Sequence, residues 1–303
     1  MEIQSKKKVV LNIFAIVIAV VLALYMVSMV IPVFWTLMTT LKHTAEYEGT
    51  MLDGVSLEKN QLWWPKYGLT FENYVTAYKN CIVRTDTGAE VGILPQFMNS
   101  ILYAVGCALS VTVVSMVMGY ASARYTYRMS SWLYLFVLIT MALPVVGSMP
   151  SEIAVAKKLQ IYDTMFGMWI MRGTFLNTYF LIFFAQFKMI PRDYTEAARI
   201  DGANPFVIMT QIIVPLAMGT VTTVFVLAFI GLWNDFQIPL LYIPSYPVAA
   251  VGMYHFQIGN INEINKKPIQ VAGVFLMAMP IVVFYGIFNK KLNVNLSVGG
   301  IKG

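Results

Sequence analysis

Three consecutive residues at the end of an apolar segment carry the chemistry of a solute-binding surface. They are Trp233, Asn234 and Asp235. Neutral sugars are bound by aromatic faces that pack against C–H groups, and by amides and carboxylates that hydrogen-bond to hydroxyls. The run therefore predicts a polar contact at the mouth of a cavity. The structural alternative is an interfacial Trp followed by an Asn that caps a helix.

A second polar stretch, residues 188–215, lies between two strongly apolar segments. Asp193, with Glu196 three residues later, predicts a capping box and a helix that begins there. Gly202 is expected to adopt the left-handed conformation that ends such a helix. The stretch is therefore expected to form an elbow rather than one continuous helix.

A second short helix is expected directly after the elbow. Asn204 fits the N-cap and Pro205 the first helical position. Pro215 is expected to break or kink this helix. The alternative for the whole stretch is an ordinary amphipathic loop between two membrane spans.

The spacing of Glu196-Ala197-Ala198, Gly202, Ile212 and Val214-Pro215 resembles the EAA signature of binding-protein-dependent ABC importer permeases. One position departs, because the family usually has Leu where this chain has Val214. In that family the loop is a cytoplasmic coupling helix that sits in a groove on the ATP-hydrolysing subunit. The resemblance implies ATPase coupling for Glu196, Ala197, Ala198, Asp201, Gly202, Asn204 and Pro205.

Physical chemistry is consistent with that role. The two alanines would let a partner surface approach closely, Glu196 offers a charge, and Gly202 sets the angle between the two helices.

The composition indicates an integral membrane protein. Of 303 residues, 58% are hydrophobic and 12% charged, against about 25% charged in soluble domains. The net charge of +6 comes from scattered basic residues, so nucleic acid is not an expected partner. Cys81 and Cys107 are not expected to meet, and no metal or redox spacing is present.

Hydropathy predicts an all-α fold with six transmembrane helices. Lysines at residues 6–8 precede the first span, which is expected to be uncleaved, bent near Pro32 and preceded by a cytoplasmic amino terminus. Lys and Arg are denser in the segments that this topology places inside, so both termini are expected in the cytoplasm. The predicted spans are about 9–39, 97–122, 132–149, 166–187, 216–236 and 269–288.

The segment 42–95 is expected to be a long outer loop. Its aromatics, Trp63 and Trp64 among them, either anchor the loop at the headgroup level or receive a sugar or a docking protein. Residues 69–74 resemble the segment before the second span of carbohydrate permeases. We therefore divide the chain into residues 1–68, with the first span and extra loop length, and a permease core at 69–303.

The chain lacks the groups that would drive transport or catalysis by itself. No predicted span has an ionisable residue near its centre, where proton- or sodium-coupled carriers usually place one. No phosphate-binding loop occurs, so ATP hydrolysis is expected on a separate chain. Neither a nucleophile–base constellation nor a metal-ligand cluster is present, so the chain is not expected to be an enzyme or to bind a cofactor.

Two further stretches resemble carbohydrate ABC permeases. The Trp233-Asn234 run resembles part of their fifth conserved span, which implies a role in the translocation pathway. The tail, residues 290–303, resembles the glycine-rich ending of the smaller maltose-type permease subunit, which reaches the ATPase dimer interface. That likeness implies ATPase contacts for Gly299, Gly300 and Lys302; a frayed terminus is the alternative.

The sequence therefore predicts one permease subunit of an ATP-driven sugar or oligosaccharide importer in a prokaryotic inner membrane. The expected partners are a second, non-identical permease, an ATPase dimer that binds ATP and Mg²⁺, an extracellular solute-binding protein, the carbohydrate and membrane lipid. Three alternatives stay open: a permease for another polar solute, an ATP-independent secondary carrier, and a membrane scaffold or sensor.

Overall fold

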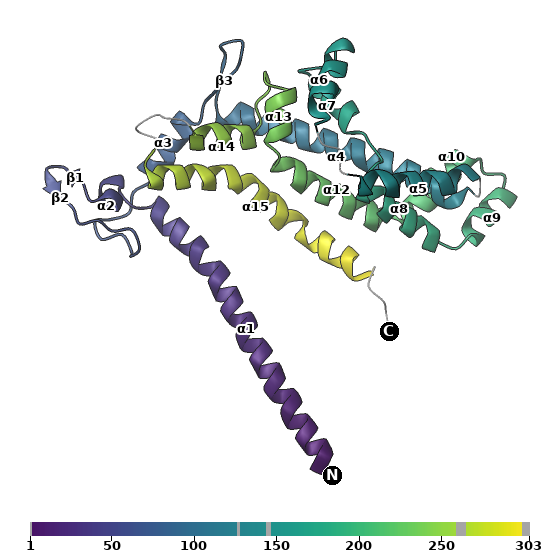
Figure 1. Ribbon diagram of the computed structural model, residues 1–303, viewed down its shortest axis with the longest axis horizontal. Helices are drawn as coiled ribbons and strands as arrows, with labels where there is room; N and C mark the ends of the chain where they lie inside the picture. The colour runs from purple at the N-terminus through teal and green to yellow at the C-terminus, as the bar shows by residue number, and fades with distance from the viewer. Residues whose placement is uncertain (1, 126–127, 144–146, 259–264, 299–303) are drawn as a thin grey trace. The chain divides into compact units, whose positions relative to one another are not determined.

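The computed structural model describes residues 2–125, 128–143, 147–258 and 265–298, and this part of the chain is mostly helical. The chain divides into two compact units (Figure 1). The first comprises Met1–Cys81 and Phe256–Leu276, and the second comprises Ile82–His255 and Met277–Gly303. Two helices, α14 (Ala249–Ile258) and α15 (Lys267–Val298), contain residues of both units.

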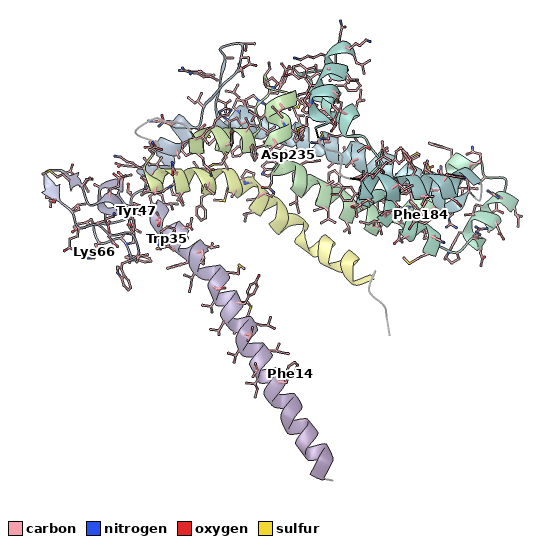
Figure 2. The ribbon with its side chains drawn as sticks, viewed as in Figure 1. Phe14, Trp35, Tyr47, Lys66, Phe184 and Asp235 are labelled. Atoms are coloured by element: carbon pink, nitrogen blue, oxygen red, sulfur yellow. The ribbon has the colours of Figure 1, made fainter. Side chains whose placement is uncertain are left out.

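The first unit begins with α1 (Glu2–Thr40), and the apolar side chains of residues 14–34 are exposed on all sides of the helix. Figure 2 shows Phe14 among the side chains that project from it. Residues Phe14–Thr40 are long and apolar enough to cross a membrane, which confirms the first predicted span by length and composition. The expected bend at Pro32 does not interrupt the helix.

The polar segment that follows α1 is structured, contrary to the loop expected from the sequence. Within the first unit it forms α2 (Thr44–Glu48), the hairpin of β1 (Met51–Leu52) and β2 (Val55–Ser56), and α3 (Glu72–Asn80). The hairpin turns at Asp53 and Gly54, which both have positive φ, at 48° and 82°. This is the two-residue Asp-Gly turn that matches the twist of paired strands.

Buried polar groups hold this segment to the end of α1. The Asn73 side chain donates to the carbonyls of Thr40 at 2.8 Å and Lys42 at 2.7 Å. The Asn60 amide donates to Glu46 Oε1 at 2.6 Å. Burial lowers the pKa of Lys42 from its ordinary value, while the charge of Glu46 opposes that shift.

The second unit contains a further hairpin and most of the helices. It has β3 (Val83–Arg84) and β4 (Glu90–Val91), which pair antiparallel. Its helices are α4 (Ile93–Arg124), α5 (Arg128–Ala142), α6 (Met149–Lys158), α7 (Met165–Arg172), α8 (Thr178–Met189), α9 (Asp193–Ile200), α10 (Pro205–Val207), the π-helix η1 (Ile208–Ile213), α11 (Val214–Leu216), α12 (Met218–Trp233) and α13 (Gln237–Tyr242).

Helix α4 is the centre of the second unit and packs against α7, α8 and α12 (Figure 1). Small residues on α4 allow this packing. A Cβ added at Gly119 would lie 2.7 Å from Cβ of Phe183 on α8. At Gly106 the added atom would lie 2.0 Å from Nε1 of Trp169 on α7. Glycine therefore sets the separation of α4 from both neighbours.

One predicted span is interrupted, and another begins at a bend. The fourth, expected as one helix over 166–187, is α7 and α8 with a break at residues 173–177. The fifth, expected from Leu216, follows a bend of 77° between residues Pro205–Leu216 and Met218–Trp233. Asn177 causes the first break, because its side chain accepts from the Phe180 N–H and caps a new helix.

Among the described residues, two helices are long and apolar enough to cross a membrane, or three if the bent pair counts as one span. These two are the predicted first and second spans, in α1 and α4. The expected third and sixth spans correspond to the shorter apolar helices Ser130–Ala142 and Lys267–Val283. Helix α15 continues past the predicted end at Phe288 to Val298, so part of the expected tail is helical. Gly299, Gly300 and Lys302 lie outside the described residues.

Candidate functional site

The elbow predicted at Gly202 is present, and its hydrogen bonds define a Schellman motif. Helix α9 ends at Ile200, and Gly202 has φ +81°. The N–H of Gly202 donates to the Arg199 carbonyl at 3.1 Å, and that of Ala203 donates to the Ala198 carbonyl at 2.9 Å. These two bonds satisfy carbonyls that the end of the helix would otherwise leave without a donor.

The start of α9 differs from the sequence prediction. The helix begins at Asp193, as expected, but Arg192 is the N-cap and no side chain caps it. The predicted capping box of Asp193 and Glu196 is therefore wrong. Backbone bonds replace it, because the N–H groups of Thr195 and Glu196 both donate to the Arg192 carbonyl. The two acids still lie in the first turn, where the helix dipole favours negative charge.

The second helix begins as predicted. The Asn204 side chain accepts from the Val207 N–H at 2.9 Å, and Pro205 occupies the first helical turn. The π-helix η1 was not predicted; such segments often occur at functional positions. The bend expected at Pro215 lies slightly later, at Ala217, which is buried between the two helical segments.

The elbow has an inner and an outer face. Ala198 is buried in a cluster with Tyr120, Phe183, Phe187 and Ile213. Glu196 and Ala197 are exposed, as are the elbow residues Asp201, Gly202, Asn204 and Pro205. Ile200 and Phe206, with exposed fractions of 86% and 69%, add large apolar side chains to the outer face. Of the two alanines, only Ala197 is therefore placed to let a partner approach; Ala198 serves packing within this chain.

A second candidate site lies where the fourth predicted span is broken. A cavity of about 340 Å³ lies between α4, the break at residues 173–177 and the end of α12. Its polar lining consists of Cys107, Arg172, Thr174, Asn177, Tyr179 and Asp235. Discontinuous helices commonly form solute sites in transport proteins, because the ends expose polar backbone groups to a cavity.

An ion pair organises this cavity. Arg172 Nη2 lies 3.3 Å from Asp235 Oδ2, and the Tyr103 hydroxyl donates to the same oxygen at 3.0 Å. The other Asp235 oxygen accepts from the Ile238 N–H at 3.2 Å. Asp235 marks the junction between α12 and α13 (Figure 2). Within the described residues, Arg172 Nε is buried without a hydrogen-bond partner.

The structure separates the three residues of the predicted binding run. Asp235 lines the cavity, whereas Trp233 is buried against Phe229 with ring centroids 5.7 Å apart. Asn234 is the C-cap of α12, and its side chain donates to the Ile230 carbonyl at 2.9 Å. Helix capping, the structural alternative for Asn234, is therefore present.

A part-buried polar contact links α13 to α6. The Tyr242 hydroxyl donates to Glu152 Oε2 at 2.9 Å. Burial raises the pKa of Tyr242 to about 12, and the Glu152 carboxylate adds to that shift.

The sequence analysis assigned no role to Arg172 or Asn177. The sequence nevertheless carries a signal for the helix break beside Arg172, since Gly173 is a residue type that ends helices and Asn177 is one that caps the start of the next helix. Among the described residues, no group of three or more His, Cys, Asp or Glu side chains could hold a metal ion.

Comparisons with known proteins place these sites in context. The sequence pattern of the family described as "Binding-protein-dependent transport system inner membrane component" matches residues 111–294, which include the elbow and the Arg172–Asp235 pair.

The chain is 24% identical over 289 residues to the diacetylchitobiose uptake system permease protein NgcG of Streptomyces coelicolor, a match that covers 94% of this chain and 88% of that protein. It is 27% identical over 282 residues to the trehalose transport system permease protein SugB of Mycobacterium tuberculosis, covering 90% and 92%.

A chain in the crystal structure of a bacterial ABC transporter involved in the import of the acidic polysaccharide alginate has a similar fold. The TM-score is 0.74 at 20% identity, and the match covers 92% of this chain and 96% of the other. This likeness shows an ABC importer permease fold.

Proposed function

The chain belongs to the family of binding-protein-dependent transport system inner membrane components, and we propose that it is a permease subunit of an ATP-driven sugar or oligosaccharide importer. The observation that carries the proposal is the elbow at Gly202, whose outer face offers Glu196, Ala197 and two large apolar side chains to a partner.

The cargo is proposed from two observations. Relatives that match most of this chain are named as permeases for diacetylchitobiose and trehalose. The cavity beside Arg172 combines a guanidinium, a carboxylate, an amide and a phenol with apolar side chains. That combination suits hydroxyl groups and the C–H surfaces between them.

The partners follow from the family and from what the chain lacks. No phosphate-binding loop occurs in the sequence, so an ATPase dimer on separate chains would bind ATP and Mg²⁺. This chain would bind no cofactor and catalyse no covalent reaction. A second, non-identical permease would complete the pore, and an extracellular solute-binding protein would deliver the sugar. The exposed apolar surface of α1 suits lipid or that second permease.

In the proposed mechanism the elbow transmits ATPase motion to the pore. The Schellman motif and the Asn204 cap hold α9 and α10 in a fixed relation. Movement of the outer face would therefore pass through η1 to the bend at Ala217, where α12 begins. Because Asp235 lies at the far end of α12, a change in the tilt of α12 would alter the Arg172–Asp235 cavity. Alternating access would result from that change.

The topology we propose has six membrane-crossing segments, some made of two helices, and both termini in the cytoplasm of a prokaryotic cell. The elbow would then face the ATPases. The carboxyl-terminal residues Gly299, Gly300 and Lys302 would contact them as well.

Reconstitution tests the proposal. The chain is purified with the subunits that accompany it and placed in vesicles, and uptake of radiolabelled di- and oligosaccharides is measured with and without ATP and Mg²⁺ at the elbow side. We expect uptake that requires ATP and the binding protein. Sugar uptake that proceeds equally without nucleotide would instead indicate a secondary carrier.

Competition distinguishes the cargo classes. Excess unlabelled amino acids or peptides should leave sugar uptake unchanged. If they inhibit it while sugars do not compete with one another, the importer carries a different polar solute.

A further inference from the structure

A second polar cavity lies beside the elbow, apart from the Arg172–Asp235 site. It has a volume of about 260 Å³ and lies between the end of α4 and the face of α9. Three of its lining residues are arginines and one is an acid, so its lining carries a net positive charge; the charged residues are Arg124, Arg192, Arg199 and Glu196.

Several hydrogen-bonding groups in this cavity have no partner within the described part of the chain. They are Nε and Nη2 of Arg124 and Oγ1 of Thr195, all of which are buried. A buried donor without a hydrogen-bond partner destabilises the fold, and more so when the group is charged, whereas an exposed donor can bond to water. A structure that retains three such atoms around one cavity indicates a bound acceptor that satisfies them.

The arrangement of the Arg124 donors indicates which kind of acceptor would bind. Nε and Nη2 lie on one edge of the guanidinium plane, and together they form the two-pronged donor that matches two oxygens of a phosphate or carboxylate. The Thr195 hydroxyl can supply a third bond. A side-chain carboxylate would leave much of a 260 Å³ cavity empty, whereas a phosphate with its ester substituents fills more of it.

The position of the cavity favours a lipid phosphate over a soluble phosphate compound. Helix α4 has 32 residues, which gives a length of roughly 48 Å at 1.5 Å per residue. A bilayer with its headgroups measures about 40–45 Å. Arg124 is the last residue of α4, so an α4 that spans the bilayer would place the cavity at the level where lipid phosphates are found.

We propose that this cavity binds the phosphate of an anionic phospholipid headgroup, with Nε and Nη2 of Arg124 and the Thr195 hydroxyl as its donors. Bound there, the headgroup would join α4 to α9 and so stabilise the inner face of the elbow. The inference concerns lipid recognition and does not depend on which solute is transported.

The test uses the full chain, purified in detergent with the subunits that accompany it. Binding of phosphatidylglycerol, of phosphatidylcholine and of inorganic phosphate is titrated in separate arms by native mass spectrometry. The variants are Arg124→Gln, which removes the charge, Arg124→Lys, which keeps the charge but loses the fork, and Thr195→Val, which removes only the hydroxyl. Arg84→Gln is the matched control, since Arg84 is exposed and pairs with Glu90 at 2.8 Å.

We expect phosphatidylglycerol to bind more tightly than phosphatidylcholine. Arg124→Gln should weaken phosphatidylglycerol binding about tenfold to a hundredfold, and Thr195→Val about threefold to tenfold, as the loss of charged and neutral hydrogen bonds predicts. Arg124→Lys should fall between the wild type and Arg124→Gln. The control should bind like the wild type. Thr195→Val keeps the proposal testable if Arg124→Gln does not fold, because its change is nearly isosteric.

Two outcomes would overturn the proposal. If both Arg124→Gln and Thr195→Val bind phosphatidylglycerol as tightly as the wild type, the cavity is not a phosphate site for lipid. If inorganic phosphate binds as tightly as phosphatidylglycerol and displaces it, a soluble phosphate compound is the ligand.

Discussion

Substitutions at Gly202 test whether the elbow depends on backbone conformation or on side-chain size. Gly202 has φ +81°, and a Cβ built there has no described atom within 4 Å. A side chain therefore meets open space, and the cost of replacing glycine comes from the left-handed backbone alone. That cost is about 1–2 kcal/mol for an L-residue such as Ala. Asn tolerates this conformation, although its side chain is larger than that of Ala.

We expect uptake per ATP hydrolysed to follow this conformational ranking. Gly202→Asn should stay near the wild type, Gly202→Ala should fall, and Gly202→Val should fall furthest, because branching at Cβ makes positive φ less accessible. A penalty of 1–2 kcal/mol changes the population of the correct elbow by about 5- to 30-fold. The complex should still assemble, since the substitution adds no clash.

The assay is ATP hydrolysis and solute uptake measured on the same reconstituted vesicles. Gly286→Ala is the control, because Gly286 lies in α15 without a positive φ and also faces open space. It should leave both rates unchanged. Weaker coupling in Gly202→Asn than in Gly202→Ala would show that side-chain size matters, and normal coupling in Gly202→Val would refute the conformational role of Gly202.

Three further predictions concern other parts of the second unit. Asn204→Ala should destabilise the start of α10 by about 1 kcal/mol, seen as faster amide exchange at Val207, while Asn204→Asp should not. Asp235→Asn leaves Arg172 partly buried without its counter-charge and should lower stability by about 1 kcal/mol; the double variant with Arg172→Gln should recover part of this loss in a thermal-unfolding cycle. Burial raises the pKa of Tyr242 from 10.0 to about 12, so the stability that the neutral phenol contributes is complete below pH 10 and is lost as pH rises through 12. The difference in 295 nm absorbance between wild type and Tyr242→Phe should therefore show no phenolate signal at pH 10.

The sequence predicted the local geometry of the elbow because its signals are short-range. Gly202, Asn204 and Pro205 each act within a few residues, and the structure places all three as expected. The capping box failed because Arg192 extends the backbone pattern by one residue, so that no side chain is needed to cap α9. The Asp53-Gly54 turn was equally readable and was missed within a segment treated as a polar loop.

The polar cavity could not be predicted from short-range signals, because it depends on contacts between distant segments. Arg172 and Asp235 are far apart in the sequence, and only the packing of α7 and α12 around α4 brings them to 3.3 Å. Hydropathy averages over a window, so an apolar stretch with one Asn and one Arg still scores as a span. The burial of Trp233 likewise follows from its tertiary contact with Phe229.

The break that hydropathy overlooked, at residues 173–177, and the bend that Pro215 predicted lie next to the two proposed sites. Asn177 begins α8 at the wall of the Arg172–Asp235 cavity, and Ala217 begins α12 directly after the elbow. A continuous helix would satisfy its own backbone and leave no polar groups for a solute. It would also have no defined point at which tilt can change. In the proposed mechanism, interruption at these positions would supply both the polar lining and the hinge that alternating access requires, and α12 would join them as one rigid element between Ala217 and Asp235.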